Sequence, residues 1–151
     1  MTQSADLLFL LHDVARMLRG EADRRARAYG MTRAQWVILF WLDRQPGLSQ
    51  KELAEILEVE PITVARLIDR LEARGMVERR PDARDRRIWR LHLLPPSAPV
   101  LADLQHERQD MHRMATGGMD GATEAAMIEG LTRMKATLVS TCRHKPLKDV
   151  A

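Results

Sequence analysis

The feature of the sequence that most constrains the fold is a pair of short amphipathic segments separated by a turn of three residues, 58–60. Ser49 and Glu52 have the spacing of a capping box, which predicts a helix N-terminus at the start of the first segment. Pro61 begins the second segment, at a helix position where its missing N–H costs nothing, and Gly75 is suited to end that helix. Two short helices joined by a tight turn form the helix-turn-helix pattern.

Apolar residues at helical spacing indicate which side of the two helices faces the core. Small Ala54 allows the helices to approach closely, and Val59 is expected to fill the corner between them. The expected inward positions of the second helix are Val64, Leu67, Ile68 and Leu71. Its expected outward positions are Ile62, Thr63, Arg66, Asp69 and Arg70. Short or forked polar groups near the N-terminal end suit a helix that reads the DNA major groove, and the alternative is an ordinary helical hairpin with solvent-facing arginines.

Two strands are predicted directly after this pair, 76–80 and 86–93, joined by a loop at 81–85 that contains turn-forming residues. Two strands behind a recognition helix form a wing. Arg84 and Arg86 would lie at its tip, which has a suitable size to enter a minor groove, where narrow A·T tracts concentrate negative potential.

The charge of the chain is concentrated in this predicted wing. Residues 78–90 contain six arginines and three acids, a local balance of +3 that equals the net charge of all 151 residues. Clustered arginines in an otherwise balanced chain favour a site for polyanions such as nucleic acid phosphates. The alternative is a solvated loop that serves solubility, and Arg79, Arg80 and Arg90 are interpreted as phosphate contacts or solvated strand positions.

The remaining segments are predicted to be helical. One long amphipathic helix runs from Leu7 to about Tyr29, and a capping box of Thr32 and Gln35 begins a second helix. That second helix is apolar nearly all round over residues 36–42, so it is expected either to be buried or to be partly buried beneath a ligand or a second subunit.

A fifth helix is predicted from Pro99 and a sixth from near Asp120 or Thr123, separated by an interruption at 116–118. One face of the fifth helix carries Val100, Leu101, Leu104, Arg108 and Met111. The sixth has an apolar stripe of Met127, Leu131, Met134, Leu138 and Cys142. Only the first helix or a partner subunit remains to cover this stripe.

The bulk composition fits one helix-rich domain of 17.3 kDa. The single cysteine, Cys142, is typical of a reducing compartment, so a cytoplasmic location is expected, with the thiol interpreted as a buried core group rather than a redox sensor. The first residues have no basic region or cleavage pattern of a signal peptide, and no uncharged stretch approaches the roughly twenty residues that span a bilayer.

The sequence gives little support for a metal centre or an active site. His106 and His112 lie on different helix faces, and His106 pairs better with Asp110, so no third ligand is placed and no metal is expected. No motif for phosphate cradling, a serine nucleophile or zinc hydrolysis occurs, so the chain is predicted not to be an enzyme and to need no cofactor.

Four ordered stretches together resemble the successive motifs of the MarR (multiple antibiotic resistance regulator) family. They are M-T-R-A-Q-W-V-I-L, L-S-Q-K-E-L-A-E-I-L, I-T-V-A-R-L-I-D-R-L-E-A-R-G-M-V-E-R-R and D-A-R-D-R-R. The resemblance implies a mainly α fold with a small β wing (α+β), namely a winged helix-turn-helix with N- and C-terminal dimerisation helices. It implies dimerisation helices at 1–30 and 96–151 around a DNA-binding lobe at 31–95.

The resemblance also implies roles for individual residues. The groove-facing positions of the recognition helix and wing tip are Ile62, Thr63, Arg66, Arg70, Arg84 and Arg86. Asp85 and Arg87 match the pair that braces the wing. The chain departs from the family after Leu93, where Leu94-Pro95-Pro96 replaces the usual Thr and Gly, which leaves the start of the fifth helix open.

A small-molecule effector is a further implication of the resemblance, because members of the family bind anionic aromatic compounds or their thioesters beside the dimerisation helices. His12 and Arg16, one helical turn apart, could supply the cation, and Trp36 and Phe40 could supply aromatic walls. The alternative is that Trp36 and Phe40 are core residues and Arg16 is solvated.

These expectations combine into one principal hypothesis: a homodimeric repressor on a pseudo-palindromic double-stranded DNA operator, released by an effector, without membrane attachment. A dimeric winged-helix module that binds an acidic protein partner instead of specific DNA is the main alternative. A small enzyme with a site lacking any known motif is a third.

Overall fold

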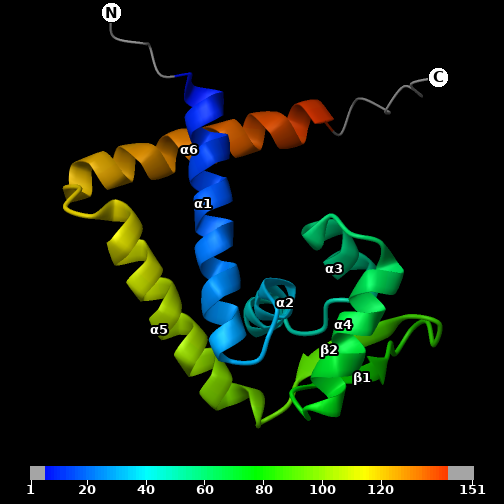
Figure 1. Ribbon diagram of the computed structural model, residues 1–151. Coiled ribbons are helices and arrows are strands. Elements are labelled where there is room, and N and C mark those ends of the chain that lie inside the picture. The colour runs from blue at the N-terminus through cyan, green and yellow to red at the C-terminus, as the bar shows by residue number, and fades with distance from the viewer. Residues whose placement is uncertain (1–5, 143–151) are drawn as a thin grey trace, which may run out of the picture. The chain divides into compact units, whose positions relative to one another are not determined.

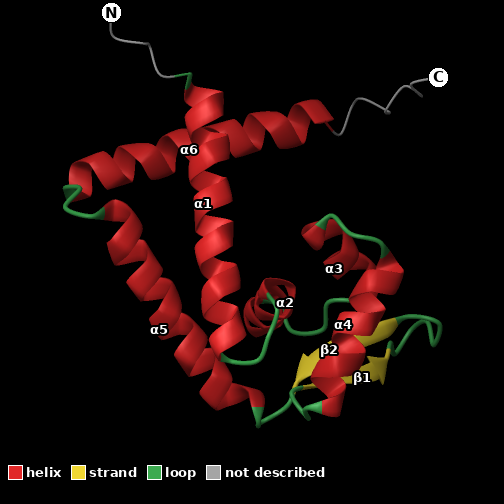
Figure 2. Ribbon diagram, in the orientation of Figure 1, coloured by secondary structure: helices red, strands yellow, loops and turns green. Residues whose placement is uncertain are grey.

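A computed structural model describes residues 6–142 of the chain. This part of the chain contains six helices and one sheet of two antiparallel strands, so the predicted fold class is confirmed (Figures 1 and 2). The elements in order are α1 (Leu7–Ala28), α2 (Arg33–Arg44), α3 (Gln50–Leu57), α4 (Pro61–Ala73), β1 (Val77–Pro81), β2 (Trp89–Leu93), α5 (Ser97–Thr116) and α6 (Gly121–Cys142). No helix among the described residues is long and apolar enough to cross a membrane.

The chain forms two compact units, which divide between Met111 and His112. The first contains α1 through β2 and most of α5, and the second contains the end of α5 and all of α6. The expected division into dimerisation helices and a DNA-binding lobe assigns segments by function, and it is a different division from these two compact units. It stays a prediction.

Local capping chemistry sets the helix ends where the sequence predicts them. At α2, Thr32 Oγ1 accepts from the N–H of Gln35 (3.2 Å) and Gln35 Oε1 accepts from the N–H of Thr32 (2.9 Å). Ser49 and Glu52 form the same reciprocal pair at α3, with N···O distances of 3.2 and 2.7 Å. Gly75, at φ +66°, ends α4 in a backbone conformation that a side chain would disfavour.

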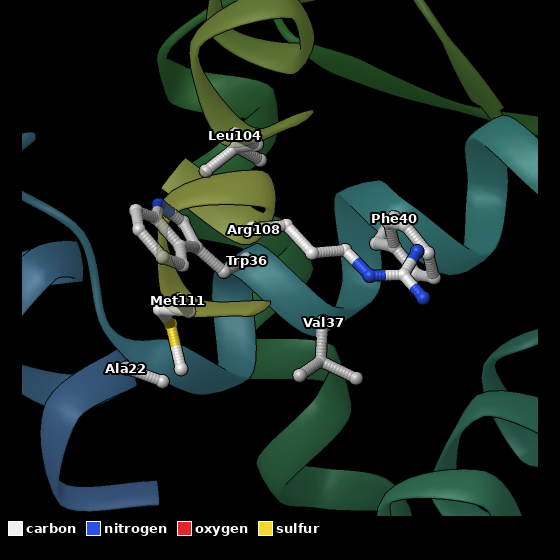
Figure 3. Close-up of a pocket in the computed structure, with 7 residues that line it drawn as sticks. All are labelled: Ala22, Trp36, Val37, Phe40, Leu104, Arg108 and Met111. Carbon is white, nitrogen blue, oxygen red and sulfur yellow. The ribbon is translucent and has the colours of Figure 1, made fainter. Parts of the chain in front are cut away.

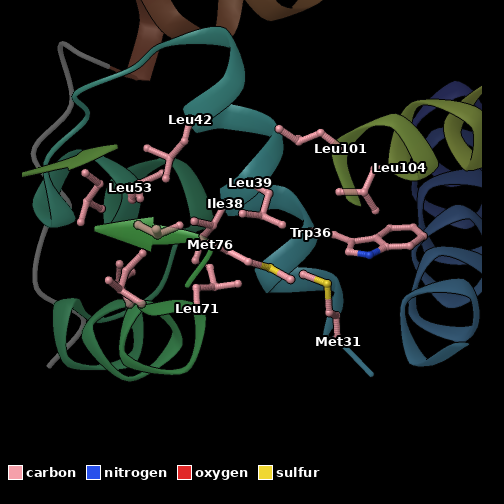
Figure 4. Close-up of a cluster of buried hydrophobic side chains, with 14 of the residues drawn as sticks. Met31, Trp36, Ile38, Leu39, Leu42, Leu53, Leu71, Met76, Leu101 and Leu104 are labelled. Carbon is pink, nitrogen blue, oxygen red and sulfur yellow. The ribbon is translucent and has the colours of Figure 1, made fainter. Parts of the chain in front are cut away.

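The core lies where α2 meets the helix-turn-helix and the wing (Figure 4). Ile38 and Leu39 at the centre of α2 are fully buried, as are the side chains that face them from the other elements. Those side chains are Leu53 from α3, Val64, Ile68 and Leu71 from α4, and Leu91 from β2. The expected inward face of α4 is therefore confirmed, although Leu67 at its margin is only half-buried.

The expectation that Val59 fills the corner between α3 and α4 is wrong, because its side chain is 39% exposed. The backbone closes this turn instead. Glu58 adopts the left-handed conformation at φ +54°, and the Val59 N–H donates to the Ala54 carbonyl at 3.1 Å. The Val59 N–H and the Ala54 carbonyl thus pair with each other at the end of α3, and no apolar side chain needs to fill the corner.

The second strand of the wing is shorter than predicted, because β2 begins at Trp89 rather than Arg86. Antiparallel pairing runs from Val77 opposite Leu93 to Pro81 opposite Trp89. Between the strands, aspartate side chains at 82 and 85 accept backbone N–H groups of residues 84, 85 and 87. These bonds hold residues 82–88 in turns and compete with strand pairing.

The C-terminal helices begin close to their predicted starts. Helix α5 begins at Ser97, two residues before Pro99, where the Ser97 hydroxyl donates to the Leu94 carbonyl at 2.7 Å. Helix α6 begins at Gly121, with Asp120 accepting from the N–H of Thr123 at 2.7 Å. The apolar stripe of α6 is largely uncovered in this chain, with Leu131 43% and Leu138 59% exposed. The Cys142 side chain lies outside the part that the structure describes.

Candidate functional site

The outward side of α4 presents the residues predicted to face a DNA groove. Ile62 is 62% exposed, and Thr63, Arg66 and Arg70 are also exposed, whereas the opposite side of the helix is fully buried. At 100° per residue, the four exposed positions fall within an arc of about 100°. The structure therefore brings them onto one continuous surface of α4.

The wing loop presents the other two predicted arginines, Arg84 and Arg86, as exposed side chains. The loop is organised around the carboxylate of Asp82, which accepts from the backbone N–H of Arg84 at 2.7 Å and from Arg90 Nε at 2.7 Å. The Arg90 guanidinium, followed by backbone N–H donors, lowers the pKa of Asp82 to about 2. Asp82 is therefore ionised at neutral pH.

Arg79 and Arg90 form ion pairs with carboxylates of other segments of the chain. This corrects their interpretation as phosphate contacts or solvated strand positions. Arg79 is only 20% exposed and pairs with Asp69 of α4 at 2.7 Å. It also pairs with Glu72, and its Nε donates to Gln50 of α3 at 2.6 Å. Arg90 joins Asp82 of the loop (2.7 Å) to Glu52 of α3 (3.1 Å). These partners lie 7 to 38 residues away in sequence and outside the strand of each arginine, so spacing alone gave no sign of them.

The predicted brace of Asp85 and Arg87 forms as a two-pronged ion pair, with both N···O distances at 3.0 Å. Arg87 is nevertheless 90% exposed, and both residues belong to the same loop. The pair therefore stiffens the loop locally. The loop is connected to β2 by the ion pair of Asp82 with Arg90, which in turn pairs with Glu52 of α3.

Ion pairing sorts the arginines of this region into two groups. Among the arginines of α4 and of residues 77–93, those with carboxylate partners are Arg79, Arg80, Arg87 and Arg90. Arg66, Arg70, Arg84 and Arg86 are exposed and have no carboxylate partner within residues 6–142. The second group coincides with the four arginines that the sequence singled out. Their charge is available to an external anion.

A second candidate site is a cavity of about 300 Å³ within the first unit, between α1, α2 and α5 (Figure 3). Its lining residues are Ala22, Trp36, Val37, Phe40, Leu104, Arg108 and Met111. The walls are mostly apolar, and Arg108 is the charged residue among them. The guanidinium carbon of Arg108 lies 4.7 Å from the centre of the Phe40 ring, a cation–π contact.

Trp36 of the cavity wall has a buried polar atom that lacks a partner among the described residues. Trp36 is 9% exposed, and its Nε1–H has no acceptor among the described residues. Leaving such a donor unpaired in a low-dielectric site costs free energy.

Of the four residues predicted to bind an effector, the structure brings Trp36 and Phe40 together and leaves His12 and Arg16 outside the lining. Arg16 pairs with Asp13 on its own helix (Nε···Oδ1 3.1 Å) and is 63% exposed. Sequence reasoning missed Arg108 as the cation of this cavity. The signal was present, because Arg108 interrupts the apolar face of the fifth helix.

A polar cluster holds α1 against α5 beside the cavity. Glu107 accepts from Arg25 at 2.6 Å and from the Tyr29 hydroxyl at 3.1 Å. Burial, followed by the Glu107 carboxylate, raises the pKa of Tyr29, so the hydroxyl stays protonated as a donor. The Tyr29 ring also contacts Trp36, with centroids 5.8 Å apart. The cluster thereby reaches the cavity wall.

Comparisons with known proteins agree with the fold and with the exposed helix-turn-helix. A family model described as the MarR family matches residues 29–88. An uncharacterized HTH-type transcriptional regulator, YsmB of Bacillus subtilis (strain 168), is 30% identical over 109 residues, covering 72% of this chain and 75% of the relative. The crystal structure of the transcriptional regulator PA3341 is 33% identical with a TM-score of 0.80, covering 89% of this chain and 99% of that one.

A crystal structure of MarR superposes with a TM-score of 0.82 at 23% identity, covering 96% of this chain and 99% of that one. At this identity the likeness concerns the fold. The family model and the relatives of at least 30% identity describe transcriptional regulators rather than enzymes. The chain therefore belongs to the MarR family and is a DNA-binding transcriptional regulator.

Proposed function

We propose that this regulator is a homodimeric repressor that binds a pseudo-palindromic operator through α4 and the wing and is released by a small anionic aromatic compound or its thioester. It acts in the cytoplasm, where operator DNA lies. The observation that carries the DNA-binding part is the difference between arginines that already pair with carboxylates and arginines that do not. On the outward face of α4 and in the wing loop, Arg66, Arg70, Arg84 and Arg86 are exposed and have no carboxylate partner within residues 6–142.

The two arginine pairs would contact DNA differently. Arg66 and Arg70 project from a helix that fits a major groove, where a forked guanidinium can donate to two acceptors of guanine. Arg84 and Arg86 project from the loop between β1 and β2, which would enter a minor groove. Ile62 and Thr63, near the N-terminal end of α4, would meet base edges or thymine methyl groups.

DNA fragments selected by the protein would define the operator, and binding to it would then be measured by fluorescence anisotropy over a series of salt concentrations. Arg66→Ala should reduce discrimination at particular base pairs by about 1–3 kcal/mol, because base contacts are specific. Arg86→Ala should weaken binding mainly where the flanks are A·T-rich. The matched control is Arg24→Ala, which removes an exposed arginine that pairs with Glu21 on α1.

Equal loss on all sequences for both variants would mean that these arginines contact only phosphates. Binding by the unaltered protein that is sensitive to salt and indifferent to sequence would contradict the proposal of a specific operator.

Dimerisation is supported by apolar side chains that a single chain leaves uncovered. At the start of α1, Leu7, Leu8 and Phe9 are 62–69% exposed, and α6 exposes the stripe described above. Two chains that bury these residues against each other would set two recognition helices about one DNA turn apart. An effector would act by favouring a separation of the two lobes that no longer matches the operator.

The cavity between α1, α2 and α5 is the proposed effector site. Its volume suits a compound of one or two rings, and its apolar walls would stack against aromatic carbons. A carboxylate on the ligand would pair with Arg108, the charged residue of the lining.

Calorimetric titration with naphthoate and with the uncharged naphthamide tests this assignment. Arg108→Gln should weaken naphthoate binding by about tenfold or more, because it removes a charge-assisted hydrogen bond, while leaving the weaker naphthamide binding nearly unchanged. Arg44→Gln is the matched control, since Arg44 also lies over the Phe40 ring, at 5.1 Å, but does not line the cavity. If Arg44→Gln and Arg108→Gln had the same effect, the anion would not bind in this cavity.

A further inference from the structure

Trp89 is a large side chain of the wing whose exposure the fold does not explain. It is 46% exposed and follows Ile88, which is 36% exposed. Its indole N–H makes no hydrogen bond within the part of the chain that the structure describes. An indole with an apolar face and a free donor is typical of a binding surface rather than of a solvated strand.

Strand geometry places Trp89 on the side of the wing that faces α4. Leu91 is fully buried, and Trp89, two residues away in β2, shares its face of the sheet. Leu91 pairs directly with Arg79, whose guanidinium reaches Asp69 and the Ala65 carbonyl of α4 at 2.7 and 3.2 Å. Trp89, opposite Pro81, is the next pair along this face toward the loop.

The charges around Trp89 favour a polyanion as its partner. The nearby carboxylates Asp82 and Asp85 are already paired with Arg90 and Arg87. Arg84 and Arg86 in the adjoining loop lack such partners among residues 6–142. The loop next to Trp89 therefore has positive charge that its own two aspartates do not offset.

We propose that Trp89 contacts the DNA backbone between the stretch that meets α4 and the stretch that meets the wing loop. Its Nε1–H donates to a phosphate oxygen, and its ring packs against the adjoining deoxyribose. The inference rests on the DNA-contact surface proposed above. It adds an uncharged side chain that contacts the DNA backbone and does not read bases in a groove.

Two substitutions separate the two parts of this contact. Trp89→Phe keeps an aromatic ring and removes the donor, so operator affinity should fall about fivefold. Trp89→Ala also removes the ring, so the loss should be larger, about tenfold or more. Neither should change the dependence of affinity on salt, because no charge is removed. Arg86→Ala should lower the salt slope by about one ion if it contacts a phosphate.

Acrylamide quenching of tryptophan fluorescence provides a direct readout, because Trp36 is buried and Trp41 is half-buried. The signal of Trp89, taken as wild type minus Trp89→Phe, should be quenched strongly in the free protein and protected when operator DNA is added. A purely structural role for Trp89 would leave this accessibility unchanged by DNA.

Operator affinity equal to wild type in both Trp89 variants, or a Trp89 signal that stays accessible on DNA, would overturn the inference. If the Arg66 and Arg86 variants still lost affinity, only the Trp89 contact would be refuted. If they too bound like wild type, the proposed DNA-contact surface would fail with it.

Discussion

At the scale of single residues, Asp82 holds the wing loop together. Its carboxylate accepts from two backbone N–H groups and from Arg90, which is why its pKa lies near 2, below the ordinary 3.8. A carboxyl group whose pKa is lowered by folding stabilises the folded state above its ordinary pKa. That contribution is lost as the pH falls between about 4 and about 2.

The Asp82→Asn variant should therefore have a free energy of unfolding that falls less steeply than that of the wild type between pH 4 and pH 2. Urea unfolding at a series of pH values measures this difference. Arg90→Gln removes the main cause of the pKa shift and should abolish most of the same pH-dependent part, so the double variant should add little to either change. Superimposable pH profiles for the wild type and Asp82→Asn would show that this carboxylate does not hold the loop.

The arginines show how far residue-level prediction from sequence can go. Arg84 and Arg86 were singled out from local context, and both are exposed without carboxylate partners among the described residues. Arg79 and Arg90 have equally basic neighbours, yet each binds acids 7 to 38 residues away. Whether an arginine is available to DNA depends on these distant partners, so its sequence neighbourhood could not decide it.

At the scale of elements, prediction was most accurate where helix ends depend on neighbouring residues. Both capping boxes and the glycine after α4 form as expected, because they involve groups only a few residues apart. The start of β2 was wrong, because aspartate side chains hold residues 82–88 in turns. His12 and Arg16 were expected to supply the cation, whereas Arg108 lines the cavity, because the approach of α5 to α2 depends on tertiary packing.

At the scale of the whole molecule, the uncovered apolar residues of α1 and α6 lead to a prediction about assembly. Leu131→Lys should place a charge within the α6 stripe, shift the protein from dimer to monomer and greatly weaken operator binding, because both half-sites must be held together. Sedimentation velocity measures the first effect, and anisotropy measures the second.

Thr132→Lys is the matched control, because it introduces the same charge at the exposed residue next to Leu131, about 100° around the helix. It should remain dimeric. A Leu131→Lys protein that sediments like the wild type would mean that the α6 stripe does not hold two chains together.

The sequence by itself determined the fold class, the helix ends and the face of α4 that points outward, because helical periodicity and capping depend on residues within one or two turns. It also located the basic segment of the wing. Only the tertiary structure decided which arginines are free, which residues line the cavity and that the face of the wing with Leu91 and Trp89 lies toward α4. These depend on contacts between elements that are remote in sequence, such as Arg79 with Asp69 and Arg108 with Phe40, which packing alone brings together.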